Sequence, residues 1–165
     1  MDHIWSPWRM KYIRANHAGH ACVFCEAIKN QDDEKYLVLH RGQFAFVILN
    51  KFPYTSGHVM VVPNSHIGSF EQMDAETSAE VMELIRRSMQ TIGSVYQPDG
   101  YNMGANLGAS AGAGIADHIH FHLVPRWDGD TNYMTSIAKT RVLPEDLCET
   151  YARLRDAWPG EQLKA

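Results

Sequence analysis

The chain has 165 residues, of which 45% are hydrophobic and 10% aromatic, and its formal net charge is −4 at pH 7. That length and apolar content suit one compact domain with a sizeable core, and two full domains would be cramped. Acidic and basic residues are interspersed, so we expect neither a nucleic acid duplex nor a membrane as a partner. The longest apolar run, Phe44 to Leu49, is too short to span a bilayer. Without a secretory signal pattern, a cytoplasmic location is expected.

The first half of the chain predicts three β-strands. Residues 36–39 and 44–49 are rich in strand-forming side chains and are separated by a glycine-containing turn. A third run, residues 58–62, ends at Pro63. Because the connections are short, we expect these strands to pair in antiparallel fashion.

A long amphipathic helix is predicted next, with Asp74 as its N-cap and an end before Pro98. Its apolar residues recur at helical spacing, so this helix should cover one face of a sheet. These residues are Val81, Leu84, Ile85, Ile92 and Val95.

The second half of the chain predicts two more strands and a closing helix. Residues 101–107 and 115–124 are the strands, and Pro144 should open the last helix. Leu147, Cys148, Tyr151, Leu154 and Trp158 would form the buried side of that helix. The expected fold class is therefore α+β, with an antiparallel sheet of about five strands, a covering helix and a C-terminal helix.

Three alternating histidines, His118, His120 and His122, carry the main chemical signal. On a strand their imidazoles would share one face, while Ile119, Phe121 and Leu123 pack on the other. Alternate histidines can bind a metal ion, or the central one can act as a nucleophile while its neighbours control its tautomer. A solvated, histidine-rich face is the remaining explanation.

The segment before the histidines, residues 106–114, contains almost no bulky side chains. Backbone N–H groups in such a loop can approach anionic oxygens closely. Placed directly before three histidines, this loop favours phosphate chemistry over a bare metal site, although a flexible connection would have the same composition.

The segment His118-Ile-His-Phe-His-Leu-Val-Pro125 resembles the signature of the histidine triad superfamily, and Gly57-His-Val-Met-Val-Val-Pro63 resembles a second strand motif of that family. The resemblance implies a homodimer of α+β subunits that binds a purine nucleotide or dinucleoside polyphosphate and forms a covalent nucleotidyl-histidine. It also implies one domain over residues 1–165, with an arm at 1–20, a core at 20–127 and a tail and helix at 128–165.

The resemblance also assigns roles to individual residues. His120 would be the nucleophile that attacks the α-phosphate, and His118, His122 and His58 would support it in catalysis. The nucleotide-binding residues would be Asn50, Asn106, Gly112, His120 and His122.

Within the superfamily, the chain is most similar to bacterial diadenosine tetraphosphate phosphorylases and hydrolases. The Trp5-Ser-Pro-Trp-Arg9 opening, the loop from Asn106 to Gly112 and Pro125-Arg-Trp127 carry this similarity. The loop has Ala113-Gly114 where many hydrolases of the family have glutamine, and it lacks the serine of the phosphorylase pattern there. Water and inorganic phosphate both remain open as the acceptor.

The pair in Cys22-Val-Phe-Cys25 has the spacing of half a tetrahedral zinc site. Many members of the superfamily complete such a site with two histidines, which here would be His66 and His118. Zinc would then be structural and would fix the strand that carries His120. A local site that uses His17 or His20, or a reduced pair without metal, are the alternatives.

A second class of function is a nucleotide sensor or a partner-binding module with little turnover. A module that only binds has no need of a nucleophile, so the intact triad favours the enzyme.

Overall fold

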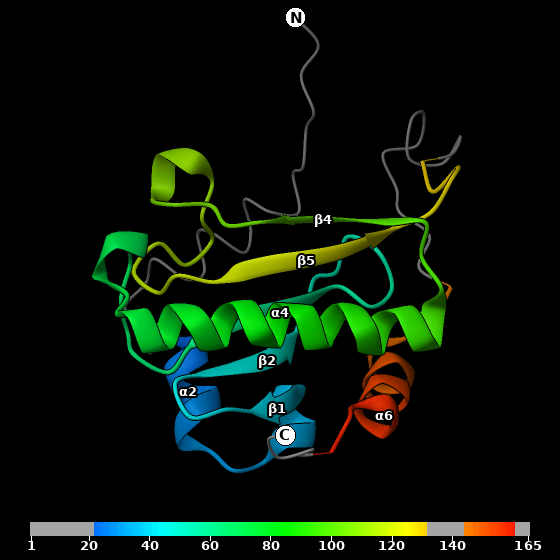
Figure 1. Ribbon diagram of the computed structural model, residues 1–165, viewed down its shortest axis with the longest axis horizontal. Helices are drawn as coiled ribbons and strands as arrows, with labels where there is room; N and C mark the ends of the chain where they lie inside the picture. The colour runs from blue at the N-terminus through cyan, green and yellow to red at the C-terminus, as the bar shows by residue number, and fades with distance from the viewer. Residues whose placement is uncertain (1–21, 132–143, 161–165) are drawn as a thin grey trace, which may run out of the picture.

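The computed structural model describes residues 22–131 and 144–160 (Figure 1). The arm at residues 1–20, with His17 and His20, and part of the C-terminal tail lie outside the described residues. The helices are α2 (Val23–Lys29), α3 (Asp33–Tyr36), α4 (Ala75–Tyr96) and α6 (Leu147–Ala157), with two short 3-10 turns, η1 (Phe70–Gln72) and η2 (Ala109–Ala111). The strands are β1 (Val38–Arg41), β2 (Ala45–Leu49), β3 (Val59–Pro63), β4 (Gly100–Gly104) and β5 (Phe121–Arg126).

The five strands form one antiparallel sheet in the order β1-β2-β3-β5-β4. This confirms the predicted α+β class. In the ladders around β5, His122 lies opposite Met60 of β3 on one side and Gly104 of β4 on the other. The last of the three histidines is therefore fixed in the sheet by pairing on both sides.

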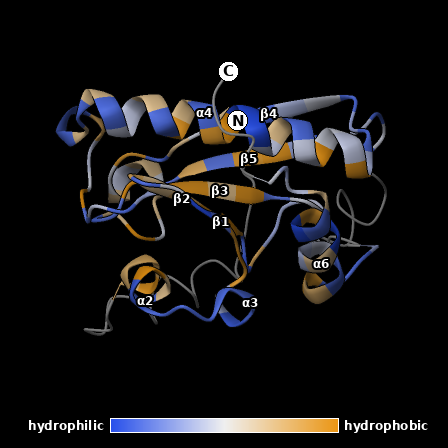
Figure 2. Ribbon diagram, turned by 60° about the horizontal axis from the view of Figure 1, so that its bottom comes forward, coloured by the Kyte–Doolittle hydropathy of each residue, from blue (hydrophilic) through white to orange (hydrophobic). Residues whose placement is uncertain are grey.

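Helices cover both faces of the sheet, with α4 on one side and α2 and α3 on the other (Figure 2). Alternate residues of β2 and β3, together with Leu123 of β5, pack against α4 and α6 in one core cluster. The residues that point the other way, such as Ile48 and Met60, pack with Phe24 of α2 in a second cluster. The second face is the one that carries the histidines.

The predicted long helix is confirmed as α4. Its N-cap is Asp74, whose side chain accepts a hydrogen bond of 2.7 Å from the Thr77 N–H, and the helix ends at Tyr96, before Pro98. The predicted apolar side is buried against the sheet, except that the last member, Val95, is only partly buried.

The first predicted strand begins two residues late. Tyr36 ends the short helix α3, which the sequence analysis did not predict, and Leu37 follows with φ 60° in the left-handed region. This turn places Val38 at the start of β1. The acidic run around Asp32 is the signal for α3, because the Asp32 side chain caps the helix by accepting from the Lys35 N–H.

The strand predicted over residues 115–124 was wrong in its first half, because β5 begins only at Phe121. Before that residue the chain bonds to the loop after β3, where the Ile119 N–H donates to the Ile67 carbonyl over 2.7 Å. The expected apolar positions Ile119 and Leu123 are buried, but burial does not alternate, because His118 and His120 are buried as well and Phe121 is only partly buried.

Three smaller expectations also needed correction. The strand predicted over residues 101–107 ends at Gly104. The last helix begins at Leu147, with Asp146 and not Pro144 at its N-terminus, because the Asp146 side chain accepts from the Glu149 N–H. Cys148 is exposed on this helix and is not a core residue. Within the described part of the chain, no helix has both the length and the apolar character needed to cross a membrane.

Candidate active site and metal centre

The imidazole rings of His120, His122 and His58 lie side by side on the face of the sheet that α2 partly covers. The ring centroids of His120 and His122 are 5.0 Å apart, and those of His122 and His58 are 5.1 Å apart. The Tyr54 ring packs on His58 at 4.8 Å. His58, His118 and His120 are all buried, so their ring nitrogens find hydrogen-bonding partners in the protein more than in solvent.

The tautomer of His120 follows from one contact. Its Nδ1 atom lies 2.9 Å from the backbone carbonyl oxygen of His118. A carbonyl oxygen can only accept, so Nδ1 carries the hydrogen. In the neutral ring the lone pair therefore lies on Nε2, the atom that a nucleophilic imidazole uses.

A second chain of hydrogen bonds orients His122. The Tyr54 N–H donates to Nδ1 of His58 over 3.1 Å, so His58 carries its hydrogen on Nε2. That Nε2–H donates to Nδ1 of His122 over 3.0 Å and leaves His122 with a hydrogen on its own Nε2. The side-chain nitrogen of Asn50 lies 3.3 Å from His58 Nδ1. The side-chain oxygen of Asn50 accepts a hydrogen bond from the Phe52 N–H. His122 can therefore donate a hydrogen bond from Nε2.

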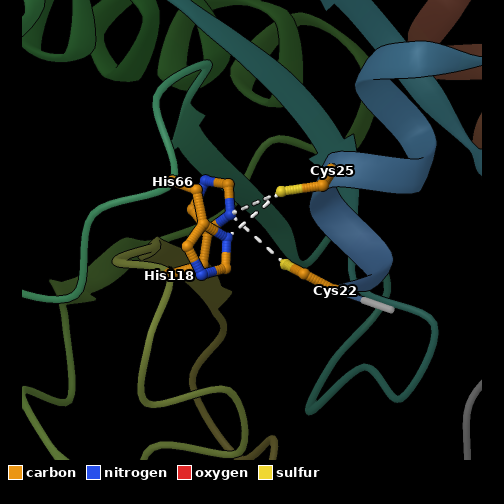
Figure 3. Close-up of side chains that lie close together, drawn as sticks. All are labelled: Cys22, Cys25, His66 and His118. Atoms are coloured by element: carbon orange, nitrogen blue, oxygen red, sulfur yellow. Dashed lines mark hydrogen bonds between the residues drawn. The ribbon is translucent and has the colours of Figure 1, made fainter. Parts of the chain in front are cut away.

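The His118 imidazole lies beside Cys22, Cys25 and His66 (Figure 3). Its Nε2 donates to the carbonyl of Pro63 over 2.9 Å, which leaves the lone pair on Nδ1. Nδ1 lies 3.3 Å from Sγ of Cys22 and 3.7 Å from Sγ of Cys25, and Cys25 Sγ is 3.1 Å from Nδ1 of His66. The four ligand atoms all lie within 4.8 Å of one another. Two thiols and two imidazoles thus converge on one point.

The two thiols respond differently to this environment. Burial would raise the pKa of the Cys22 thiol, but the neighbouring His118 and the backbone N–H groups of Cys25 and Phe24 lower it to about 6. Burial and the neighbouring charge of Cys22 raise the pKa of Cys25. Two adjacent thiolates repel each other, so a cation between them would favour the doubly ionised pair.

Two cavities meet at His122 and Tyr54. One, of about 870 Å³, contains His120 and Asn50 and has a mainly apolar wall, formed by Phe24, Leu37, Ile48, Met60 and Ile115. The other, of about 1060 Å³, is more polar and is lined by Asn102, Asn106, Arg126, Trp127 and Arg153. The two predicted asparagines therefore lie in different cavities.

Gly112 does not line either of these cavities among the described residues; Gly114 lines the apolar one. Gly112 instead ends η2 with φ 89°, a left-handed conformation that glycine adopts without strain.

Sequence reasoning missed Phe24 as part of this site. Its ring centroid lies 5.3 Å from that of His118 and 5.1 Å from that of His120. Phe24, Ala27 and Ile28 have helical spacing, and this pattern is the signal that could have revealed α2 and its buried side.

The sequence model of the HIT domain matches residues 31–129, which include β1 to β5 and all three triad histidines. The chain belongs to the HIT domain family. The resemblance found in the sequence is thereby confirmed.

Two relatives show the range of activities named for similar HIT proteins. An AP-4-A phosphorylase from Mycobacterium tuberculosis is 37% identical over 96% of this chain and 85% of its own length. An adenosine 5'-monophosphoramidase from Schizosaccharomyces pombe is 28% identical over 77% of this chain and 90% of its own length.

Solved HIT structures agree with the fold. A zinc-bound histidine triad family protein from Mycobacterium smegmatis superposes with a TM-score of 0.68 at 28% identity, and the match covers 84% of this chain and 93% of that one. A histidine triad nucleotide-binding protein from Sulfolobus tokodaii gives 0.66 at 26% identity, with 82% and 91% covered.

Proposed function

We propose that this HIT protein is a nucleotidyl hydrolase or transferase that acts on the α-phosphate of a purine nucleotide or dinucleoside polyphosphate. The observation that carries the proposal is the hydrogen bond from His120 Nδ1 to the His118 carbonyl, which puts the lone pair of a buried imidazole on Nε2. The names of the two relatives support nucleotide chemistry.

In the proposed reaction, Nε2 of His120 forms a bond to the α-phosphorus while the bond from phosphorus to the bridging oxygen breaks. The bridging oxygen leaves with the electron pair as a phosphate anion, which the Nε2–H of His122 stabilises by donating a hydrogen bond. Inorganic phosphate, or water that releases a proton to the solvent, then attacks the nucleotidyl-histidine and displaces Nε2 of His120. His58 keeps His122 in the donating tautomer, because its Nε2–H bonds to Nδ1 of His122.

The two cavities suggest how a substrate lies. A nucleoside would occupy the apolar cavity, which Asn50 and Ile48 line, with Asn50 toward its ribose and Ile48 toward its base. The α-phosphate would then lie at His120 and His122, near the loop that contains Gly112. The remainder of a dinucleoside polyphosphate would extend into the polar cavity, which Asn106 lines.

We also propose a structural zinc ion held by Cys22, Cys25, His66 and His118. The donor set fits, since two sulfurs and two nitrogens within 4.8 Å of one another match a closed tetrahedral site. Bound zinc would cross-link α2 to the loop after β3 and to the start of the triad. A metal ion bound by the triad itself is disfavoured, because Nδ1 of His118 faces Cys22 and its Nε2 is bonded to the Pro63 carbonyl, so His118 cannot share an ion with His120 and His122.

A homodimer is proposed from the exposed edge of the sheet. β4 is one of the two terminal strands, and Met103 on it is 54% exposed. Met89 of α4 is also exposed, and its carbonyl accepts from the Tyr101 hydroxyl of β4, so the two elements are adjacent. A second copy that pairs at β4 would bury this apolar surface and cover the strand edge.

A cytoplasmic location is proposed because thiols serve as metal ligands where they stay reduced.

The deciding experiment incubates the protein with diadenosine tetraphosphate, with and without inorganic phosphate. ADP and ATP that form only with phosphate identify a phosphorylase, and AMP and ATP without it identify a hydrolase. His120→Ala should abolish both reactions, whereas His40→Ala, a histidine on β1 outside the site, should not. Nucleotide binding without any product would overturn the enzyme and favour a binding module.

A further inference from the structure

Helix α2 is held at both of its ends by residues far away in the sequence. At its N-terminal end, Cys22 and Cys25 lie against His118 and His66. At its C-terminal end the side chain of Arg41, on β1, reaches the last turn. There Arg41 donates to the carbonyl oxygens of Ala27 at 2.8 Å, Ile28 at 3.3 Å and Asn30 at 2.7 Å.

These contacts stabilise a helix that is short and has no side-chain cap at its N-terminus. α2 has only seven residues, and its N-cap, Cys22, makes no side-chain capping bond. A helix this short is not stable alone, so its position depends on its tertiary contacts. Arg41 is in turn fixed by Asp33, whose carboxylate accepts from Nε at 2.7 Å. The orientation of α2 is therefore set by the cysteine cluster at one end and by Arg41 at the other.

Phe24 lies between Cys22 and Cys25 in the sequence, and its side chain is only 3% exposed. Its ring meets that of His118 edge to face, at an interplanar angle of 74°, and that of His120 at 48°. The hydrogen bond from Nδ1 to the His118 carbonyl holds one side of the His120 ring. The Phe24 ring packs against it and restricts its rotation, because a close-packed neighbour leaves no space for another rotamer.

We propose that Phe24 is a positioning residue for His120, and that α2 transmits the state of the metal centre to the nucleophile through this ring. The inference rests on the proposed function of His120. It extends that function, since loss of metal would free the Cys22 end of α2 and release the Phe24 ring from the imidazole. The His120 ring could then turn about its Cβ–Cγ bond and lose the hydrogen bond from Nδ1 to the His118 carbonyl. Both tautomers would then be populated, and Nε2 would no longer present its lone pair to the phosphorus.

The test compares Phe24→Leu with Phe70→Leu, the same change at a phenylalanine that is 52% exposed. With ¹⁵N-labelled histidine, wild type and Phe70→Leu should show a single His120 tautomer with the hydrogen on Nδ1. Phe24→Leu and wild type stripped of metal by a chelator should both show a mixture of tautomers. On diadenosine tetraphosphate, kcat of Phe24→Leu should fall about tenfold or more, because small misplacements of a reacting group are costly.

Arg41→Gln is the second variant, since it leaves the Phe24 ring and both cysteines in place and loosens only the far end of α2. It should shift the His120 tautomers in the same direction by a smaller amount, even if Phe24→Leu does not fold. A single wild-type tautomer in Arg41→Gln and in the chelated protein would overturn the inference. Failure of the proposed function is recognised separately, by a wild-type protein that transfers no nucleotidyl group, and the tautomer measurement does not depend on turnover.

Discussion

His118 connects the candidate nucleophile to the metal centre through two different parts of the same residue. Its backbone carbonyl accepts the Nδ1 hydrogen of His120 at 2.9 Å, and its own Nδ1 faces Cys22 at 3.3 Å. The Nε2–H of His118 is bound to the Pro63 carbonyl, so the ring cannot turn without losing that bond. The tautomers of both histidines are therefore set by backbone carbonyl oxygens.

His58→Phe should slow nucleotidyl transfer about tenfold or more while leaving the protein folded. The residue is fully buried, and phenylalanine fills a similar volume but cannot donate to His122 Nδ1. His122 would then populate both tautomers and lose its role as a donor. Measuring kcat with diadenosine tetraphosphate checks this, with circular dichroism to confirm the fold. His40→Phe, outside the site, is the matched control. Equal rates in both variants would contradict the role of His58 in orienting His122.

Metal analysis of the purified protein should find one zinc ion per chain. Cys25→Ser should lose most of that zinc and lower the melting temperature, because metal binding energy contributes directly to folding when the ligands come from separate segments. Cys148→Ser supplies the matched control, since this cysteine is exposed on α6 and outside the cluster. Equal zinc content in the two variants would rule out the proposed ligand set.

The sheet and α4 could be predicted because their signals are local. The Asp74 cap, the apolar side of α4 and the β-rich runs each depend on neighbouring residues. The contacts that link the site elements are not local. Arg41 holds α2 from eleven or more residues away, and His118 is 96 residues from Cys22. The periodicity of a sequence does not indicate contacts between such distant residues. The contact between His118 and Cys22 was suggested only by the family resemblance.

The start of β5 shows a further limit. The alternation around His120 indicates which side chains share a face, but it does not say where the strand ladder begins. That point depends on the partner: β3 pairs with β5 only from Val61 to Val59, opposite residues 121–123. His118 and His120 precede this ladder and are held by the Pro63 and His118 carbonyls instead. The side-chain pattern therefore predicted the burial of Ile119 and Leu123 correctly and the limits of the strand incorrectly.

Glu80→Gln should destabilise the fold by about 1 to 3 kcal/mol, because it replaces hydrogen bonds to a charged acceptor and leaves at least one partly buried donor without a partner. The carboxylate of Glu80, on α4, accepts from the backbone N–H groups of Gln43 at 3.0 Å, Phe44, and Ala45 at 2.8 Å, in the turn between β1 and β2. An amide keeps only one accepting oxygen. A Cβ at Gly42 would lie 2.7 Å from the Glu80 Oε1 atom, so glycine permits this approach.

Urea denaturation of Glu80→Gln and wild type measures this difference. Glu83→Gln, on the same helix, removes an exposed ion pair with Arg86 and should cost no more than about 0.5 kcal/mol. If the two variants lose the same stability, the carboxylate does not hold the β1–β2 turn in the way the hydrogen bonds indicate.

The pair of Arg126 and Asp130 should make the stability depend on pH in the acid range. The Arg126 side chain, with bonds of 2.5 Å and 2.7 Å, lowers the pKa of Asp130 from its ordinary 3.8 to about 2, and the Trp127 N–H adds to this. A pKa lower in the folded state means that the folded protein binds fewer protons there. The contribution is therefore complete above about pH 4 and is lost as the pH falls toward 2.

Melting temperatures of wild type and Asp130→Asn between pH 7 and pH 2.5 test this. The variant should melt at a lower temperature than wild type at pH 7, and the difference should shrink as the pH falls, because protonation removes the same charge from wild type. Arg126→Gln should behave in the same way, and combining both changes should cost less than their sum, since each removes the same ion pair. A temperature difference that stays constant across this range would mean that Asp130 stabilises the protein through packing and not through its charge.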